Sequence, residues 1–254
     1  MAPDDINDPA LAAAVDKQRR IWAKEAKRYD RQMAFWERVL FGDARAWVCA
    51  QASGDVLEVA IGTGRDLPFY PPDIRLTGLD LSPEMLAIAK DAASHIGRTV
   101  TLKEGDAHQL PYPDESFDTV VCVFSLCNIT DMRKAIAEMH RVLRPGGPLL
   151  LADHVISTNP IARGVQRAFE KLTIRLAGDH QTRRPLPIVT DTGFTIERRQ
   201  RDKLGIVERI TAHKPSCPHD SGWDANDHRR RDETRACDAP TPHWPMPDCH
   251  RALR

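Results

Sequence analysis

Hydrophobic residues recur at helical spacing among many charges over residues 1–52. They are Ala10, Leu11, Val15, Ile21, Trp22, Met33, Phe35, Trp36, Val39, Leu40 and Phe41. A helix with one apolar face and an otherwise charged surface buries that face against a neighbouring core. The pattern predicts an N-terminal helical cap over residues 1–52.

Between residues 53 and 215, short β-branched runs alternate with helical patterns, which is typical of βα units around a mainly parallel sheet. Seven strands are predicted, at 55–60, 75–79, 99–103, 117–123, 148–152, 194–199 and 206–212. Helices are predicted at 83–93, at 132–142 and around 161–176. The prediction is an α/β domain with a seven-stranded, mainly parallel sheet and helices on both of its faces.

The composition changes again over residues 216–254, which hold one Leu, no Ile or Val, five Pro, four His and three Cys. So few apolar residues cannot offset the entropy cost of ordering the chain, and we predict a disordered tail. No Cys or His pair there has the spacing of a zinc site, so no metal is expected. The six cysteines of the chain follow no regular spacing, and reduced thiols are expected.

The charges balance, with 36 Lys and Arg against 36 Asp and Glu, so nucleic acid is not an expected partner. No run approaches the length of a membrane-spanning helix and the N-terminus lacks the order of a signal peptide, so a cytoplasmic location is expected. The Arg-rich region 154–187 could make a peripheral contact with a membrane or hold an anionic acceptor. A solvated helix face is the favoured interpretation of that region.

The strongest local pattern is a buried strand that runs into a glycine turn at residues 56–65. Gly62 and Gly64 permit positive φ and the close approach of a ligand at the carboxyl end of the first strand. A dinucleotide fingerprint would need a third glycine where Leu67 stands, and the lysine of a P-loop is absent. The turn alone fits a ligand site and a plain connection from strand to helix equally well.

Asp80 ends the second strand, 16 residues after Gly64, where a carboxylate can accept bonds from both hydroxyls of a ribose. Ser82, followed by Pro83, is the better candidate for the cap of the next helix, which leaves Asp80 for a ligand. After the third strand, Asp106 could accept a bond from an adenine amino group. The fourth strand leads into residues 124–126, and a helix ends in Pro and Gly at 145–147.

In this order, these segments resemble the class I S-adenosylmethionine (SAM)-dependent methyltransferases of the type 11 group, which includes the ubiquinone and menaquinone C-methyltransferases. The resemblance covers roughly residues 29–215. Residues 125–129 (Ser-Leu-Cys-Asn-Ile) and 141–147 are also similar to phosphatidylethanolamine N-methyltransferases and to methyltransferase-like thiol methyltransferases. The resemblance implies a Rossmann-like fold, SAM as cofactor, and a small-molecule or lipid-like acceptor, such as a quinol, a thiol or a phospholipid amine.

The resemblance also implies a set of cofactor contacts. They are Tyr29, Glu58, Gly62, Thr63, Gly64, Asp80, Leu81, Asp106, Ala107 and Val123. Glu58 and residues 62–64 would surround the methionine part, Asp80 would hold the ribose, and residues 81, 106 and 107 would lie against the adenine. The backbone of Val123 would meet the methionine amino group, and Tyr29 would close over the cofactor. Ala60 replaces the first glycine of the family's E-x-G-x-G-x-G pattern, and its methyl group is expected to tighten the turn without blocking it.

Methyl transfer from a sulfonium is an in-line displacement, so alignment, exclusion of water and removal of a proton are the tasks of such an enzyme. Candidate bases are His154, Asp179 and His180, and a structural histidine is the favoured interpretation of His154. His108 is expected to be a solvated loop residue, and Cys127 a buried inert thiol.

Two alternatives remain beside the enzyme. A non-catalytic SAM-binding module or assembly subunit would explain Ala60 and the lack of an obvious base, and an NAD-dependent oxidoreductase is disfavoured by the missing third glycine. The attacking atom of the acceptor and the oligomeric state stay open.

Overall fold

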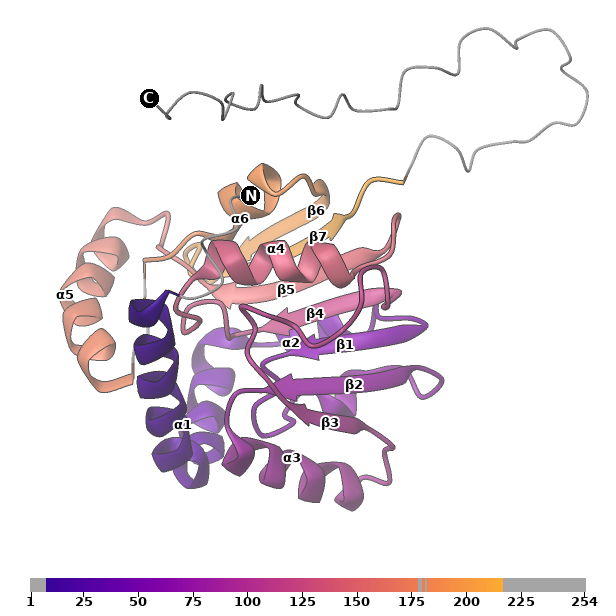
Figure 1. Ribbon diagram of the computed structural model, residues 1–254. Coiled ribbons are helices and arrows are strands. Elements are labelled where there is room, and N and C mark those ends of the chain that lie inside the picture. Colours follow the sequence, from indigo (N-terminus) through magenta and orange to yellow (C-terminus); the bar gives the residue numbers. More distant parts are fainter. Residues whose placement is uncertain (1–7, 178–179, 181, 217–254) are drawn as a thin grey trace, which may run out of the picture. The chain divides into compact units, whose positions relative to one another are not determined.

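A computed structural model describes residues 8–177, 180 and 182–216 of the chain (Figure 1). The predicted disordered tail therefore lies outside the described residues, apart from Ser216. The described part contains one central sheet with helices packed on both faces.

The sheet has seven strands in the order β3-β2-β1-β4-β5-β7-β6. They are β1 (Asp55–Val59), β2 (Arg75–Asp80), β3 (Thr101–Glu104), β4 (Thr119–Val123), β5 (Pro148–His154), β6 (Thr195–Asp202) and β7 (Val207–His213). β1 to β5 pair in parallel, whereas β7 runs antiparallel to both β5 and β6. The predicted seven-stranded, mainly parallel sheet is confirmed.

Several strand boundaries differ from the prediction for a tertiary reason. β6 runs three residues further than predicted, to Asp202, because β7 pairs with it there. β5 runs two residues further than predicted, because β7 pairs with it as far as His154 opposite Val207. β4 starts at Thr119 rather than at Phe117, which forms only an isolated bridge to Leu143. His154 therefore lies at the end of the strand rather than after it.

The helices are α1 (Pro9–Trp36), α2 (Ala44–Cys49), α3 (Pro83–His95), α4 (Met132–Val142), α5 (Pro160–Ala177) and α6 (Pro185–Asp191), with a π-helical turn at Glu37–Phe41 and a 3-10 turn at Leu67–Phe69. α4 begins where the side chain of Asp131 accepts a bond from the Lys134 amide, and its buried face includes Ile136 and Met139. α6 was not predicted from the sequence, because seven residues with two prolines show no helical period.

Alternate side chains of the strands feed two separate cores. Leu57, Val120 and Leu149 pack with α4 and α6 on one face of the sheet. Val56 and Leu150 pack with α2 and α3 on the other. The alternation follows from the two-residue period of a strand, and it confirms helices on both faces.

α1 and the two segments that follow it correspond to the predicted cap region. α1 contacts α3 and α5, and α2 packs directly against β4, β5 and β7. In the described part of the chain, no helix combines the length and the apolar composition needed to cross a bilayer.

Candidate functional site

A cleft opens at the carboxyl ends of β1, β2 and β4, beneath α1. Its empty volume, mouth included, is about 840 Å³, which is within the usual range for a small-molecule site. Of the predicted cofactor contacts, the lining includes Tyr29, Gly62, Thr63, Asp80, Leu81, Asp106, Ala107 and Val123. The structure thus brings together residues from five separate segments of the sequence.

The glycine turn has its backbone in the left-handed region at three positions. Ala60, Gly62 and Gly64 have φ values of 59°, 58° and 78°. A Cβ added at Gly62 would meet no atom within 4 Å, so a side chain there would extend into open space. A Cβ at Gly64 would lie 2.7 Å from the Leu67 side chain. Gly62 therefore keeps the turn open, and Gly64 lets it pack closely.

We expect the replacement of Ala60 by glycine to raise the free energy of unfolding by up to about 1 kcal/mol. The left-handed conformation costs a residue with a Cβ about 1–2 kcal/mol, and the greater freedom of glycine in the unfolded chain offsets part of that gain. Urea denaturation measures the change. Ala87→Gly, on the exposed side of α3, is the matched control and should lower stability by about 1 kcal/mol. An equal loss of stability in both variants would contradict a strained Ala60.

Asp80 is held in place by two backbone amides at the end of β2. Its Oδ2 accepts from Gly62 N at 2.8 Å, and its Oδ1 accepts from Ser82 N at 2.9 Å. Burial raises the pKa of Asp80 to about 6, against the opposing effect of these amides. Ser82 caps α3 by accepting from Met85 N, as predicted. The Asp80 carboxylate is thus fixed in orientation and lines the cleft.

His108 is buried, so its prediction as a solvated loop residue was wrong. Its Nε2 accepts from the Asp131 amide at 3.0 Å, which places the ring proton on Nδ1, where it is donated to Asp106 Oδ1. Burial acts to raise the pKa of Asp106, but the bonds from the His108 side chain and backbone lower it below its ordinary value. His108 therefore ties the loop after β3 to the start of α4.

Glu58 and Gly64 are the two predicted contacts that do not appear in the cleft lining. The Glu58 side chain is fully buried and accepts from the Tyr70 hydroxyl at 3.0 Å. Burial, followed by the charge of Asp66, raises the pKa of Glu58 well above its ordinary value. Glu58 therefore interacts with Tyr70 and Asp66 and does not line the cleft.

Sequence reasoning missed Arg45, a buried residue that lines the cleft from α2. Its Nη1 donates to both carboxylate oxygens of Asp66 at 2.9 Å, and its Nε donates to Glu37 at 2.7 Å. Its guanidinium also lies 5.0 Å from the centre of the Phe124 ring. No local pattern marks these residues, because the partners are far apart in the sequence and meet only in the folded chain.

A second set of contacts joins α1 to the glycine turn. The Thr63 hydroxyl donates to Asp30 Oδ1 at 2.6 Å, and Arg65 forms ion pairs with both Asp30 and Glu37. Tyr29, beside Asp30, has its pKa raised to about 12 by burial, although Arg45 acts in the opposite direction. Tyr29 therefore remains protonated at neutral pH and can donate a hydrogen bond into the cleft.

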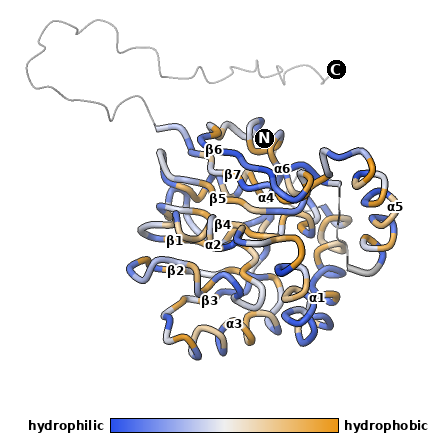
Figure 2. The backbone as a smooth tube through the Cα atoms, turned by 180° about the vertical axis from the view of Figure 1, so that it is seen from behind, coloured by the Kyte–Doolittle hydropathy of each residue, from blue (hydrophilic) through white to orange (hydrophobic). Residues whose placement is uncertain are grey.

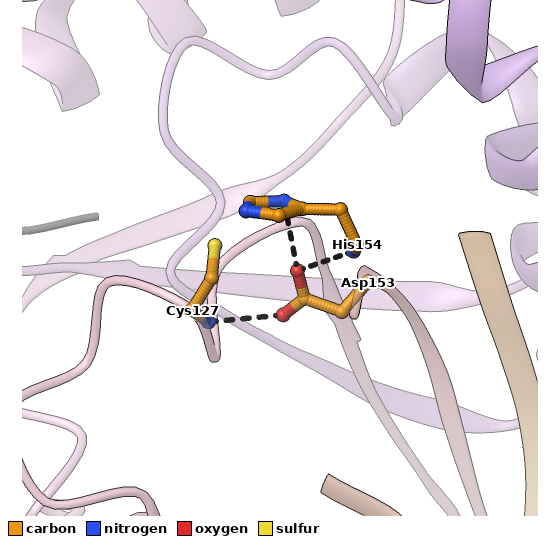
Figure 3. Close-up of side chains that lie close together, drawn as sticks. All are labelled: Cys127, Asp153 and His154. Atoms are coloured by element: carbon orange, nitrogen blue, oxygen red, sulfur yellow. Dashed lines mark hydrogen bonds and ion pairs between the residues drawn. The ribbon is translucent and has the colours of Figure 1, made fainter. Parts of the chain in front are cut away.

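The candidate base His154 belongs to a buried cluster with Cys127 and Asp153 (Figure 3). Asp153 accepts from the amides of Cys127 and His154, at 3.0 and 2.7 Å, and so fixes the loop after β4 to β5. Phe41 stacks on Phe124 at 4.1 Å and faces the His154 ring at 6.4 Å. His154 is not in the cleft lining.

The second candidate base that the structure describes, His180, does not line the cleft either. It donates its backbone N–H to the Cys127 carbonyl at 3.2 Å. Asp179 lies outside the described residues. The roles of all three candidate bases stay predictions.

Comparison with known proteins places this site in a family. A family model described as a methyltransferase domain matches residues 57–151. A phosphatidylethanolamine N-methyltransferase of Cereibacter sphaeroides is 35% identical over 61% of this chain and 72% of its own. A demethylmenaquinone methyltransferase of Deinococcus radiodurans is 37% identical, over 58% and 65%. A human thiol S-methyltransferase is 34% identical, over 50% and 53%.

Solved structures show the same fold. A SAM-dependent methyltransferase from Thermotoga maritima superposes with a TM-score of 0.60 at 23% identity, covering 78% of this chain and 99% of that one. One from Mesorhizobium loti gives 0.52 at 20% identity, over 67% and 96%. With the sequence relatives and the cleft at the strand ends, they establish that the chain belongs to the class I SAM-dependent methyltransferases, for which SAM is the methyl donor.

Proposed function

We propose that the cleft binds SAM through those predicted residues that line it, with Asp80 as the main anchor. The fixed Asp80 carboxylate is the observation that carries this proposal, because it offers a ribose two oriented acceptor atoms on a side chain that is itself buried. Asp106, held by His108, would meet the adenine edge. Thr63 and the open face of Gly62 would receive the methionine part.

The acceptor that we propose has an apolar body and a small nucleophilic head. The cleft has apolar walls at Val15, Trp22, Phe124 and Ile129, and the Trp22 and Tyr29 rings meet edge to face at 5.8 Å. The names of the relatives give a phosphatidylethanolamine, a demethylmenaquinone and a thiol as substrates, and the first two have an apolar body of this kind. SAM supplies an electrophilic methyl group on a sulfonium, and the walls of the cleft align the acceptor with it and exclude water.

Among the described residues that line the cleft, few side chains are available to remove a proton from the acceptor. The carboxylates of Asp66, Asp80 and Asp106 each already accept hydrogen bonds, and Tyr29 stays protonated. We infer that the acceptor is a thiol, a quinol or an amine that passes its proton to solvent rather than to a side chain of the protein. Catalysis then rests mainly on positioning.

Titration calorimetry with S-adenosylhomocysteine (SAH) on the full chain tests the cofactor site. Release of SAH from SAM, measured by mass spectrometry with a menaquinol analogue, an alkyl thiol and a phosphatidylethanolamine, tests the acceptor class. We expect micromolar SAH binding and turnover with at least one of the three. Binding without turnover on all three would contradict the acceptor class, and it would revive the non-catalytic module that the enzyme relatives disfavour.

We also propose the domain organisation that the sequence suggests, with a cap over 1–52, a methyltransferase domain over 53–215 and a dispensable extension over 216–254. Removal of residues 217–254 is expected to leave both the melting temperature and the SAH affinity unchanged, because this stretch has few apolar residues to bury. Differential scanning fluorimetry and calorimetry measure the two quantities. A large loss of either would show that the extension belongs to the folded enzyme.

A further inference from the structure

α5 is attached to the rest of the protein through polar contacts on its inner face. Gln166 is buried, accepts from the Ser157 amide at 2.7 Å and donates to the Val155 carbonyl at 3.0 Å. One turn later, Glu170 accepts from both the amide and the hydroxyl of Thr182. The side of α5 that faces the protein is therefore held by hydrogen bonds, the reverse of an ordinary surface helix.

The outward side of α5 carries an exposed apolar stripe. Its members are Ile161, Val165, Phe169 and Leu172, with 78%, 65%, 47% and 50% of their surface exposed. Spacings of four, four and three residues place them on one face, and Figure 2 shows hydrophobic positions along this helix. A continuous exposed stripe of this kind marks an interaction surface.

A row of cations runs beside the apolar stripe. Arg167, Lys171 and Arg175 follow each other at four-residue spacing and are all exposed. Within the part of the chain that the structure describes, none of the three forms an ion pair with a carboxylate, and the one acidic residue of α5, Glu170, is bonded to Thr182 instead. The exposed side of α5 is thus both apolar and positively charged.

We propose that α5 docks onto the surface of an anionic phospholipid bilayer, with the apolar stripe in the acyl boundary and the three cations among the headgroups. A purely apolar protein groove would leave the cations unpaired, whereas an anionic bilayer satisfies both features at once. α5 follows the carboxyl end of β5, the edge of the sheet that bears the cleft, and it contacts α1, which lines that cleft (Figure 1). On the proposed function, docking would bring a lipid-like acceptor to the enzyme.

Flotation of the full-length protein with vesicles tests the docking. Vesicles of phosphatidylcholine and phosphatidylglycerol at about 70:30 are expected to bind the protein at least about tenfold more tightly than pure phosphatidylcholine, with weakening in high salt. Val165→Ser with Phe169→Ser should lower the partition coefficient at least about tenfold, and Arg167→Gln with Lys171→Gln by a similar factor. Leu204→Ser is the control: it removes a leucine before β7 that is as exposed as Val165, with 63% of its surface exposed, and it should leave the partition coefficient unchanged.

Calorimetry with SAH on the same variants separates this proposal from the proposed function, because none of the substituted residues lines the cleft. Vesicle binding that fails while SAH binding persists would overturn only the docking. Vesicle binding that survives the α5 substitutions but is lost on deletion of residues 217–254 would assign the membrane contact to that segment and overturn the docking of α5. Light scattering tests self-association. If the wild type is a dimer that does not bind vesicles, and the Val165→Ser, Phe169→Ser double variant is a monomer, the stripe is a dimer interface and the docking proposal is overturned.

Discussion

Replacement of Asp80 by alanine is expected to weaken SAH binding by about 100-fold, which corresponds to about 3 kcal/mol. The carboxylate is the charged acceptor that two amides orient in the cleft, and each bond to a charged group contributes about 1.5–3 kcal/mol. Titration calorimetry measures the affinity. Asp91→Ala removes an exposed carboxylate on α3 and should leave it unchanged. Equal affinities for Asp80→Ala and the wild type would show that the ribose is held elsewhere.

The same carboxylate makes the affinity depend on pH. The pKa of Asp80 is about 6 in the ligand-free protein, because burial disfavours the charged form. Hydroxyl donors bind the ionised carboxylate, so the affinity should be constant above pH 7 and fall about tenfold per pH unit below pH 6. Asp80→Asn has no such group to titrate, and its weaker binding should stay level between pH 5 and 8. A wild-type affinity that is level over this range would contradict the role given to Asp80.

Replacement of Arg45 by alanine is expected to lower the free energy of unfolding by about 3–5 kcal/mol. The change leaves Asp66, with only 2% of its surface exposed, as a buried charge without its bidentate partner. It also frees Glu37 from α2 and removes the cation from the Phe124 ring. Urea denaturation followed by tryptophan fluorescence measures the loss.

Two further variants separate the buried ion pair from a general effect of lost charge. Arg45→Met with Asp66→Leu removes both charges and should regain much of the stability, because an apolar pair of similar volume needs no compensation. Arg75→Ala breaks the exposed ion pair with Asp55 and should have no measurable effect. A loss as small for Arg45→Ala as for Arg75→Ala would show that Asp66 finds another partner.

The sheet could be predicted because its signal is local. The buried strands are short apolar runs, such as Val120–Val123 in β4 and Leu149–Ala152 in β5, and the turn residues that separate the runs mark where the connections lie. The boundaries that were missed depend on pairing: β5 extends to His154 only because β7 lies alongside it. α6 escaped prediction because its apolar residues, such as Val189, find their partners in the core next to α4.

Much of the cleft was predictable for a related reason. Residues that follow parallel strands must gather at one edge of the sheet, so Gly62, Asp80 and Asp106 could be expected to meet. The buried position of His108 could not be foreseen, because it depends on a free amide at Asp131 on another segment. The buried ion pair of Arg45 and Asp66 was equally hidden, since neither residue belongs to a recognisable motif.

The sequence by itself determined the α/β architecture, the glycine turn, the carboxylate at the end of β2 and the membership of the methyltransferase family, because these features depend on residues close together in the chain. The tertiary structure alone decided which polar groups become buried partners and which face of α5 is left outward. Burial and charge pairing depend on which residues are neighbours in space. The hydrophobic period of α5 alone predicts that its apolar side faces the protein, whereas the hydrogen bonds of Gln166 and Glu170 turn that side outward.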